Sequence, residues 1–309
     1  MDEKISKVEI ELLSAAIDRI VMQEVLEDEL LGTLPKVDEL NDSNKIYRGK
    51  VSVLFVDMRE STKLPEKYSA EQLVKVYRSY IRVVVQAIRY SGGVVRDFMG
   101  DGVLAIFIDD TDGTSEDKAV HAARYITTVI DKFLNPVLDQ KMKHRISCGI
   151  GIHTGEISLS KVGMRGKEQN ENSENEFGIA WIGNSTNLAC KQSSAVECGT
   201  TFISTSTYAA ISDVNKSEKW KQVEISKGTN ILKGYIAEQY YLLLDEECEP
   251  CIAKSCLNTK NTTDIFDEKI EEITQRAEDL GLKQQKLDEK AQQLTCLLYT
   301  SDAADEARS

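Results

Sequence analysis

Residues 92–107 read GGVVRDFMGDGVLAIF and contain two short apolar runs separated by a Gly-Asp-Gly turn. Both runs are rich in Val, Ile and Phe and are too short for helices. They therefore predict the two strands of a hairpin, Gly93–Phe98 and Gly102–Phe107. Asp101 lies at the tip of this hairpin, where a turn favours Asp for its own local reasons. The other motifs of the chain decide whether Asp101 is only a turn residue or part of a functional site.

The composition narrows the class of protein. The chain has 309 residues, of which 41% are hydrophobic and 29% charged, as in ordinary globular proteins. Its net charge of −13 argues against nucleic-acid binding. No signal peptide and no apolar run near the ~18 residues of a membrane span are apparent. The odd number of cysteines, seven, fits the reducing cytoplasm. In CEPC (Cys248–Cys251), with no histidine nearby, we favour free thiols over a zinc site.

The first half of the chain predicts a helical extension followed by a core. Residues 4–31 show helical spacing of apolar and charged residues, within an N-terminal segment of residues 1–45. This helix is expected to pack on the body or on a partner. Val51–Met58 is apolar up to its Asp-Met end, which indicates a strand buried on both faces.

The core continues with alternating helices and strands. This pattern predicts an α+β fold in which helices cover one face of a mixed or antiparallel sheet. The expected elements are helices over Ala70–Tyr90 and Ser115–Leu134, a strand pair over Arg145–Gly163, a solvated loop over 167–176, a strand over Gly178–Gly183, a helix over Asn184–Val196 that Asn184 or Ser185 caps, and strands over Thr201–Ser204 and Glu238–Leu244.

The last part of the chain has a different pattern. Residues 246–262 are polar and predict a linker, and residues 263–295 repeat apolar positions at spacings of three and four. That repeat indicates a coiled coil, with a single amphipathic helix docked on the body as the alternative. Residues 296–309 break the repeat and resemble an in-frame translation of a sequencing adapter, so we exclude them from the biology and expect the true C-terminus to be missing.

Two carboxylates at strand ends predict a metal site. Asp57 ends an apolar strand and Asp101 tips the hairpin, and a buried strand does not end in an unpaired charge without compensation. If the strands are neighbours, the carboxylates converge as hard ligands for Mg²⁺ or Mn²⁺. The sequence MREST after Asp57 leads into a helix, and such a turn offers backbone N–H groups to phosphate. Together these features indicate phosphoryl transfer on a nucleoside triphosphate.

Five ordered motifs extend this interpretation. VSVLFVDMREST, FMGDGVLAIF, GIGIHTGEI, WIGNSTNLACK and LKG resemble, in order and spacing, the class III nucleotidyl cyclases. The resemblance implies a ferredoxin-like catalytic domain over residues 46–245. It also implies a head-to-tail homodimer with active sites at the interface, where a 3′-hydroxyl attacks the α-phosphate and pyrophosphate leaves.

The resemblance also implies roles for single residues. Asp57 and Asp101 match the two metal aspartates, and the backbone carbonyl of Met58 would be a further ligand to two divalent cations (Mn²⁺ or Mg²⁺). The remaining positions match residues of the nucleotide half of the site: Asn187 for the ribose, Lys191 in place of a transition-state arginine, and Lys233 for the terminal phosphates. The lysine at 191 replaces a bidentate fork by a point charge, which puts the rate in question more than the reaction.

The base-reading positions fit neither purine pattern. Asp97 stands where adenine-specific members carry a lysine, and Ala180 where they carry an aspartate or threonine. The pattern most resembles the pyrimidine nucleotide cyclases of bacterial antiphage (Pycsar) defence, in which Arg96 and Tyr47 match residues associated with the base pocket. The alternatives are an ion pair between Arg96 and an acid, Asp97 included, and a plain surface role for Tyr47.

The resemblance leads to a functional hypothesis with open alternatives. We expect a cytoplasmic enzyme that converts UTP to cyclic UMP as a signal in antiphage defence, read by a separate effector, with no nucleic-acid or membrane partner. The alternatives are a cytidylate cyclase acting on CTP, an adenylate or guanylate cyclase, and a catalytically silent, cyclase-like regulatory dimer.

Overall fold

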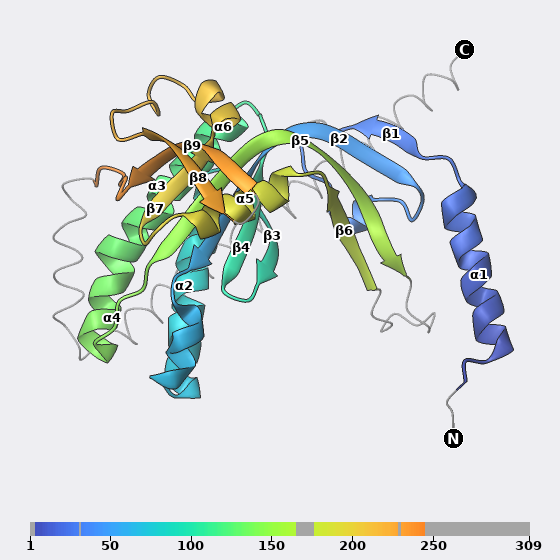
Figure 1. Ribbon diagram of the computed structural model, residues 1–309, viewed down its shortest axis with the longest axis horizontal. Helices are drawn as coiled ribbons and strands as arrows, with labels where there is room; N and C mark the ends of the chain where they lie inside the picture. Colours follow the sequence, from blue (N-terminus) through green and yellow to red (C-terminus); the bar gives the residue numbers. More distant parts are fainter. Residues whose placement is uncertain (1–3, 31, 165–175, 228–229, 245–309) are drawn as a thin grey trace, which may run out of the picture. The chain divides into compact units, whose positions relative to one another are not determined.

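The computed structural model describes residues 4–30, 32–164, 176–227 and 230–244 (Figure 1). The elements in chain order are α1 (Lys7–Met22), β1 (Leu26–Glu29), η1 (Val37–Glu39), β2 (Lys45–Met58), η2 (Ser61–Glu66), α2 (Ala70–Tyr90), β3 (Val94–Met99), β4 (Gly102–Phe107), α3 (Ser115–Val129), η3 (Ile130–Leu134), α4 (Asn135–Met142), β5 (Cys148–Met164), β6 (Glu176–Ile182), α5 (Ser185–Ala195), β7 (Thr200–Ser204), α6 (Thr205–Ala210), β8 (Lys221–Lys227) and β9 (Asn230–Glu238).

The chain divides into two units, Met1–Leu243 and Leu244–Ser309, and the helices and strands named above all belong to the first. The predicted linker, coiled coil and adapter-like end lie outside the described residues, as do the CEPC thiols and nearly all of the solvated loop. Within the described ranges, no helix is both long and apolar enough to cross a bilayer.

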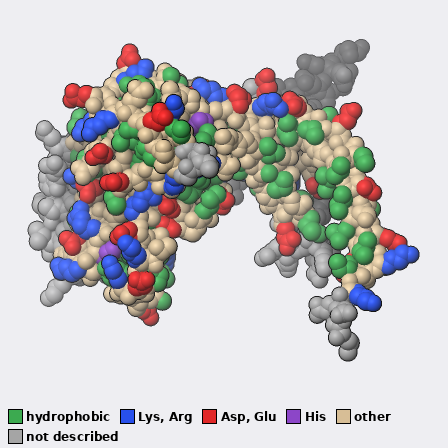
Figure 2. Space-filling view, in the orientation of Figure 1, with side chains coloured by type: hydrophobic (Ala, Val, Ile, Leu, Met, Phe, Trp, Pro, Cys, Tyr) green, Lys and Arg blue, Asp and Glu red, His purple; other side chains and the backbone are tan. Residues whose placement is uncertain are grey.

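The N-terminal helix is present but ends earlier than predicted. It stops at Met22, and the chain continues into β1, which pairs with the start of β2. The amide of Asn44 holds the end of α1 by donating to the carbonyls of Ile20 (2.6 Å) and Gln23 (3.1 Å). No residue of α1 is buried, and its apolar side chains line the exposed surface (Figure 2). Packing on the described body is therefore not observed, and packing on a partner stays a prediction.

The strands of the described residues form one mixed sheet of nine. Seven lie in the order β3-β4-β2-β5-β7-β9-β8, with β1 beside β2 and β6 beside β5. The pairs β5–β7 and β1–β2 are parallel and the others antiparallel. The predicted hairpin is confirmed as β3 and β4, and it pairs directly with β2. Because β4 pairs with β2, the two motifs that contain the aspartates lie on neighbouring strands.

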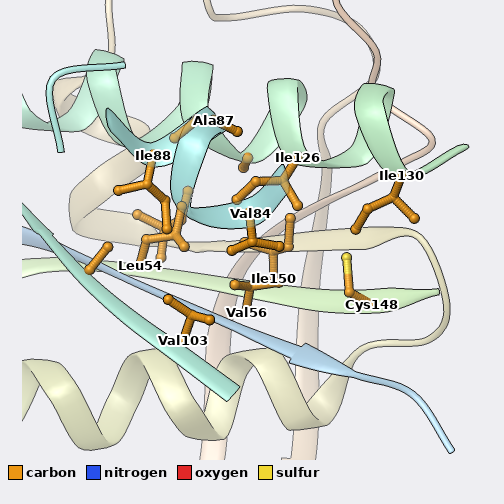
Figure 3. Packing of buried hydrophobic residues seen from close by; sticks show 14 of the residues in the cluster. Leu54, Val56, Val84, Ala87, Ile88, Val103, Ile126, Ile130, Cys148 and Ile150 are labelled. Atoms are coloured by element: carbon orange, nitrogen blue, oxygen red, sulfur yellow. The ribbon is translucent and has the colours of Figure 1, made fainter. Parts of the chain in front are cut away.

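One face of the sheet packs against the long helices (Figure 3). Leu54 of β2 and Ile150 of β5 meet Val84 and Ile88 of α2 and Ile126 of α3. Helix α2 has the predicted bounds because Ser69 and Gln72 form a reciprocal capping box at its start. This layer is the main hydrophobic core and confirms the α+β arrangement of a sheet under helices.

The opposite face carries the shorter helix α5, so helices lie on both faces and not, as the sequence predicted, on one face only. Ala189 of α5 packs there with Val53 of β2 and Ile157 of β5. The close approach depends on Gly151, at which an added Cβ would collide with the carbonyl oxygen of Ala189 and the amide nitrogen of Ser193. These obstacles are backbone atoms and cannot rotate away, so the glycine sets the position of α5.

Replacing Gly151 by alanine is expected to lower the free energy of unfolding by about 1–3 kcal/mol, since the added methyl overpacks the α5 interface. Chemical denaturation followed by the fluorescence of Trp181 and Trp220 measures the change. Gly178→Ala on β6 is the matched control, because a Cβ there meets nothing within 4 Å. Equal stability of the two variants would contradict the role given to Gly151.

Two predicted strands differ from the structure. Arg145–Gly163, predicted as a strand pair, forms the single long strand β5, which pairs with β2 along one edge and with β7 and then β6 along the other. The last predicted strand, Glu238–Leu244, is wrong, since β9 ends at Glu238 and Gln239 turns the chain with a positive φ of 47°.

Candidate active site

The two aspartates meet where β2 ends. Asp57 points to the face that carries α5, opposite to the core side chains of β2, and its side chain is 32% exposed. Asp101 lies in the β3–β4 turn, which Gly100 closes with a φ of 66°. Its Oδ2 accepts a hydrogen bond from the backbone N–H of Met58 at 3.1 Å. The structure therefore brings together the three residues expected to hold metal ions.

The electrostatics of this pair favour a bound cation. Burial, followed by the charge of Asp101, raises the pKa of Asp57, while Arg59 and Lys227 oppose the rise. The repulsion between two adjacent carboxylates is relieved by a divalent ion. In the described part of the chain, no group of three or more His, Cys, Asp or Glu side chains is placed to bind metal. The carbonyl of Met58 and oxygens of a phosphate ligand or water would complete the coordination.

Arg59 is a residue of this site for which the motifs predicted no role. Its guanidinium Nη1 lies 3.4 Å from Oδ2 of Asp57, and its side chain is only 16% exposed. The sequence feature that could have identified Arg59 is its place directly after a buried strand, because a long charged side chain there is near enough to pair with groups of the folded core. The predicted phosphate cradle in MREST corresponds to the turn through Glu60 into η2, and phosphate binding there stays a prediction.

Helix α5 presents Asn187 and Lys191 one turn apart on the same side. Asn187 is exposed and Lys191 half-buried, whereas Ala189 and Ser193 face the sheet. At about 100° per residue, the two pairs point in opposite directions from the helix axis. Asn187 and Lys191 therefore project away from the face on which Asp57 of the same chain lies. Asn184, one of the two residues predicted as the cap, occupies the N-cap position, although its side chain makes no capping hydrogen bond there.

Lys233 lies on β9 and is paired across the strands with Glu224 of β8. Its Nζ is 3.1 Å from Oε2 of Glu224, and both side chains are exposed. An exposed ion pair of this kind is worth about 0–1 kcal/mol, and phosphate binding by Lys233 stays a prediction.

A β-bulge in β3 sets the direction of the Arg96 side chain. The register of β3 against β4 shifts between Val95 and Asp97, so Arg96 and Asp97 stand together opposite Leu104. The Arg96 guanidinium lies 5.4 Å from the ring centroid of Trp181, within cation–π range. Burial lowers the pKa of Arg96, and its Nε has no hydrogen-bond partner. Among ion pairs of the described residues none joins Arg96 to Asp97, whose Oδ1 accepts the N–H of Phe98 at 2.8 Å.

Trp181 is the β6 residue that meets Arg96, and although it begins the motif WIGNSTNLACK, the sequence analysis gave it no role. Ala180 is its neighbour and faces the other side of the strand, opposite Ser160 of β5. Tyr47 of β2 and Trp181 flank the same residue, Leu159, and thus share one face of the sheet. A tyrosine, a tryptophan and an arginine therefore lie on the α5 side.

Similarity to known proteins covers most of the described chain. Residues 44–244 match the family described as "Adenylate and Guanylate cyclase catalytic domain". A uridylate cyclase of Xanthomonas perforans is 27% identical over 175 residues, which are 56% of this chain and 70% of that protein. A cytidylate cyclase of Escherichia coli is 30% identical over 134 residues, or 41% of this chain and 29% of that protein. The match thus spans less than a third of the Escherichia protein's length.

Solved structures agree on the fold. The guanylyl cyclase Cya2 superposes with a TM-score of 0.50 at 26% identity, covering 62% of this chain and 93% of the Cya2 chain. The adenylyl cyclase CyaB from P. aeruginosa gives a TM-score of 0.51 at 23% identity, and the match covers 65% of this chain and 97% of the CyaB chain.

Proposed function

Because the chain belongs to the family of adenylate and guanylate cyclase catalytic domains, we propose that it is a metal-dependent nucleotide cyclase that converts UTP to 3′,5′-cyclic UMP and pyrophosphate. The observation that carries the cyclase assignment is the meeting of Asp57 and Asp101 at the N–H of Met58. Asp57, Asp101 and the Met58 carbonyl would hold two divalent cations. These ions, when bound, would polarise the 3′-hydroxyl and neutralise the triphosphate.

The protein's own groups would do the remaining work. Asn187 would hold the ribose so that its 3′-oxygen faces the α-phosphate, because in-line geometry lowers the barrier. Lys191 would stabilise charge that develops on the phosphate during the attack, and Lys233 would bind the leaving pyrophosphate oxygens. Each of these roles is supported by the motif match, and Asn187 and Lys233 are exposed while Lys191 is half-buried.

A homodimer with shared sites is part of this proposal. Asn187 and Lys191 project from the side of α5 that faces away from the sheet, and Asp57 of the same chain lies on the sheet side. One subunit therefore offers a metal half-site and a nucleotide half-site that point apart. A head-to-tail pair would join the halves of two chains into two complete sites.

The pyrimidine preference rests on the base side of the site. Relatives named uridylate cyclase and cytidylate cyclase both match the chain, as does a relative named adenylate cyclase. Arg96, held over Trp181, is a donor suited to the carbonyl oxygens of uracil, and Asp97 beside it is an acceptor suited to an amino group. CTP is thus the second candidate. We further propose a cytoplasmic second-messenger role in antiphage defence with a separate effector, as the resemblance implies.

Incubating the protein with each of the four nucleoside triphosphates and Mn²⁺ tests the assignment. Cyclic UMP as the main product, identified by mass spectrometry, would support it. Cyclic CMP would shift the specificity to the second candidate. Cyclic AMP or cyclic GMP as the main product would overturn the pyrimidine assignment, and no product with any triphosphate would favour a silent regulatory dimer.

Arg96→Ala is expected to lower kcat/KM for the preferred pyrimidine triphosphate about a hundredfold, because a charged hydrogen bond in a closed pocket is worth roughly 2–3 kcal/mol. Binding of Mn²⁺ and of inorganic triphosphate should change little. The matched control is Arg82→Ala, which removes an arginine of α2 outside the site. If Arg96→Ala retains full activity, Arg96 only packs on Trp181 and does not read the base.

A further inference from the structure

Arg59 connects the metal-binding end of β2 with the C-terminal end of α5. Its Nη2 donates to the carbonyl of Ser193 and to that of Val196, the latter at 3.0 Å. Carbonyls in the last turn of a helix lack partners within the helix, and a cation is favoured at that end. The backbone N–H of Arg59 also donates to Ser147 just before β5, at 2.8 Å. Arg59 thus fixes the end of α5 to the strand that carries Asp57.

A glycine makes room for this guanidinium. Gly149 of β5 is the cross-strand partner of Asp57. An added Cβ at Gly149 would collide with Nη2 of Arg59 and would lie 2.8 Å from the carbonyl oxygen of Ser193. The Arg59 guanidinium therefore occupies the space that a side chain at position 149 would fill. This close packing supports the placement of Arg59 separately from its hydrogen bonds.

The same guanidinium contacts a metal ligand. Nη1 lies 3.4 Å from Oδ2 of Asp57, while Nη2 is engaged at α5. With both terminal nitrogens directed at groups of the fold, Arg59 is oriented for positioning and not for binding substrate. Its planar fork supplies two directions at once, which a lysine cannot.

We propose that Arg59 is a positioning residue that sets α5 against Asp57, so that one side chain controls both half-sites of its subunit. This inference rests on the proposed function, in which α5 serves the site completed by the partner and Asp57 serves the other. Arg59 then acts on two active sites. A residue that only adjusted Asp57 would act on one, and a residue that only stabilised the fold would leave turnover unchanged in the folded fraction.

Mixed dimers separate these cases. In one mixture, the chain Arg59→Met/Asn187→Ala meets the chain Asp57→Asn, and the working site has the variant Arg59 on its metal side. In the other, Arg59→Met/Asp57→Asn meets Asn187→Ala, and the variant Arg59 stands behind the working α5. We expect kcat to fall about ten- to a hundredfold in both mixtures, since small misplacement of reacting groups has effects of this size. A fall in only one mixture, or in neither, would overturn the proposal.

The control mixtures use Arg124→Met in the same two arrangements. Arg124 is likewise a half-buried arginine that donates to a backbone carbonyl, that of Tyr241 at 3.2 Å, but it contacts no residue of the site. Its substitution is expected to lower stability without changing kcat per folded dimer. The mixture of Asp57→Asn with Asn187→Ala and native Arg59 tests the shared site itself, so its failure would count against the proposed function.

Hydrogen exchange tests the role of Arg59 without an activity measurement. In the metal-free protein, Arg59→Met should speed amide exchange in the last turn of α5 at least about tenfold and leave α3 unchanged. Mn²⁺ should slow exchange at that turn in the native chain, because an ion that fixes Asp57 also fixes the guanidinium that contacts both Asp57 and the α5 carbonyls. The Mn²⁺ effect should vanish in Arg59→Met. An equal effect of Mn²⁺ in both proteins would overturn the coupling.

Discussion

Asp57→Asn and Asp101→Asn are each expected to lower cyclase turnover at least about a thousandfold, which corresponds to about 4 kcal/mol of transition-state stabilisation. Each change replaces one charged oxygen with an amide nitrogen of similar size. In Asp101→Asn, the amide oxygen of the new side chain can still accept the N–H of Met58, so the hydrogen bond at the end of β2 is preserved. The loss of activity would therefore come from the metal ligand and not from the fold.

A thermal shift with Mn²⁺ separates metal binding from stability. Because a ligand that binds only the native state raises the melting temperature, Mn²⁺ should stabilise the native chain and neither variant. Asp112→Asn removes an exposed carboxylate outside the site and should retain both the shift and the activity. If either site variant keeps most of its turnover, Asp57 and Asp101 do not hold catalytic ions.

The strongest sequence patterns predicted the central layer of the fold. The hairpin was predicted because its apolar runs meet at a Gly-Asp-Gly turn, and the long helix over Ala70–Tyr90 was also predicted; the structure adds that Ser69 caps it. The meeting of Asp57 and Asp101 followed from one assumption, that their strands are neighbours, and β2 and β4 do pair. Local patterns decide these features, so they are visible without the fold.

Where a pattern is set by distant contacts, the sequence was misleading. The glycines of β5 resemble turn residues, but Gly149 and Gly151 are there because Arg59 and α5 approach the strand closely. The apolar stretch after Glu238 resembles a strand, but it leaves the sheet, and Tyr240 packs in the main core. No local feature distinguishes these uses of glycine and of apolar residues.

The same reason explains the residues missed at the site. Trp181 is adjacent to the predicted Ala180, but only the register of β6 against β5 shows which of the two faces Arg96. The bulge that places Arg96 beside Asp97 on one face is likewise a property of strand pairing and not of the sequence RD. Motif spacing identified the region that we propose as the base pocket, and the strand pairing identified the contacts that Arg96 makes there.

Mixing two inactive variants is expected to restore activity if the sites are shared. In Asp57→Asn the metal half-site fails, and in Asn187→Ala the nucleotide half-site fails. When the two chains exchange freely in equal amounts, half of the dimers are mixed and each has one intact site of two, so about a quarter of the native activity should return. Sites built within one chain would return none.

A double variant sharpens this test by reversing it. A chain with both Asp57→Asn and Asn187→Ala spoils both sites of any dimer that it enters, because it gives a defective metal half to one site and a defective nucleotide half to the other. Mixed in equal amounts with the native chain, it should leave about a quarter of the activity of native protein at the same total concentration. Sites within single chains would leave half, since every native chain would keep its own. The proposal that Asn187 and Asp57 of one subunit serve different sites predicts the lower value, because Asn187 lies on the side of α5 away from the sheet.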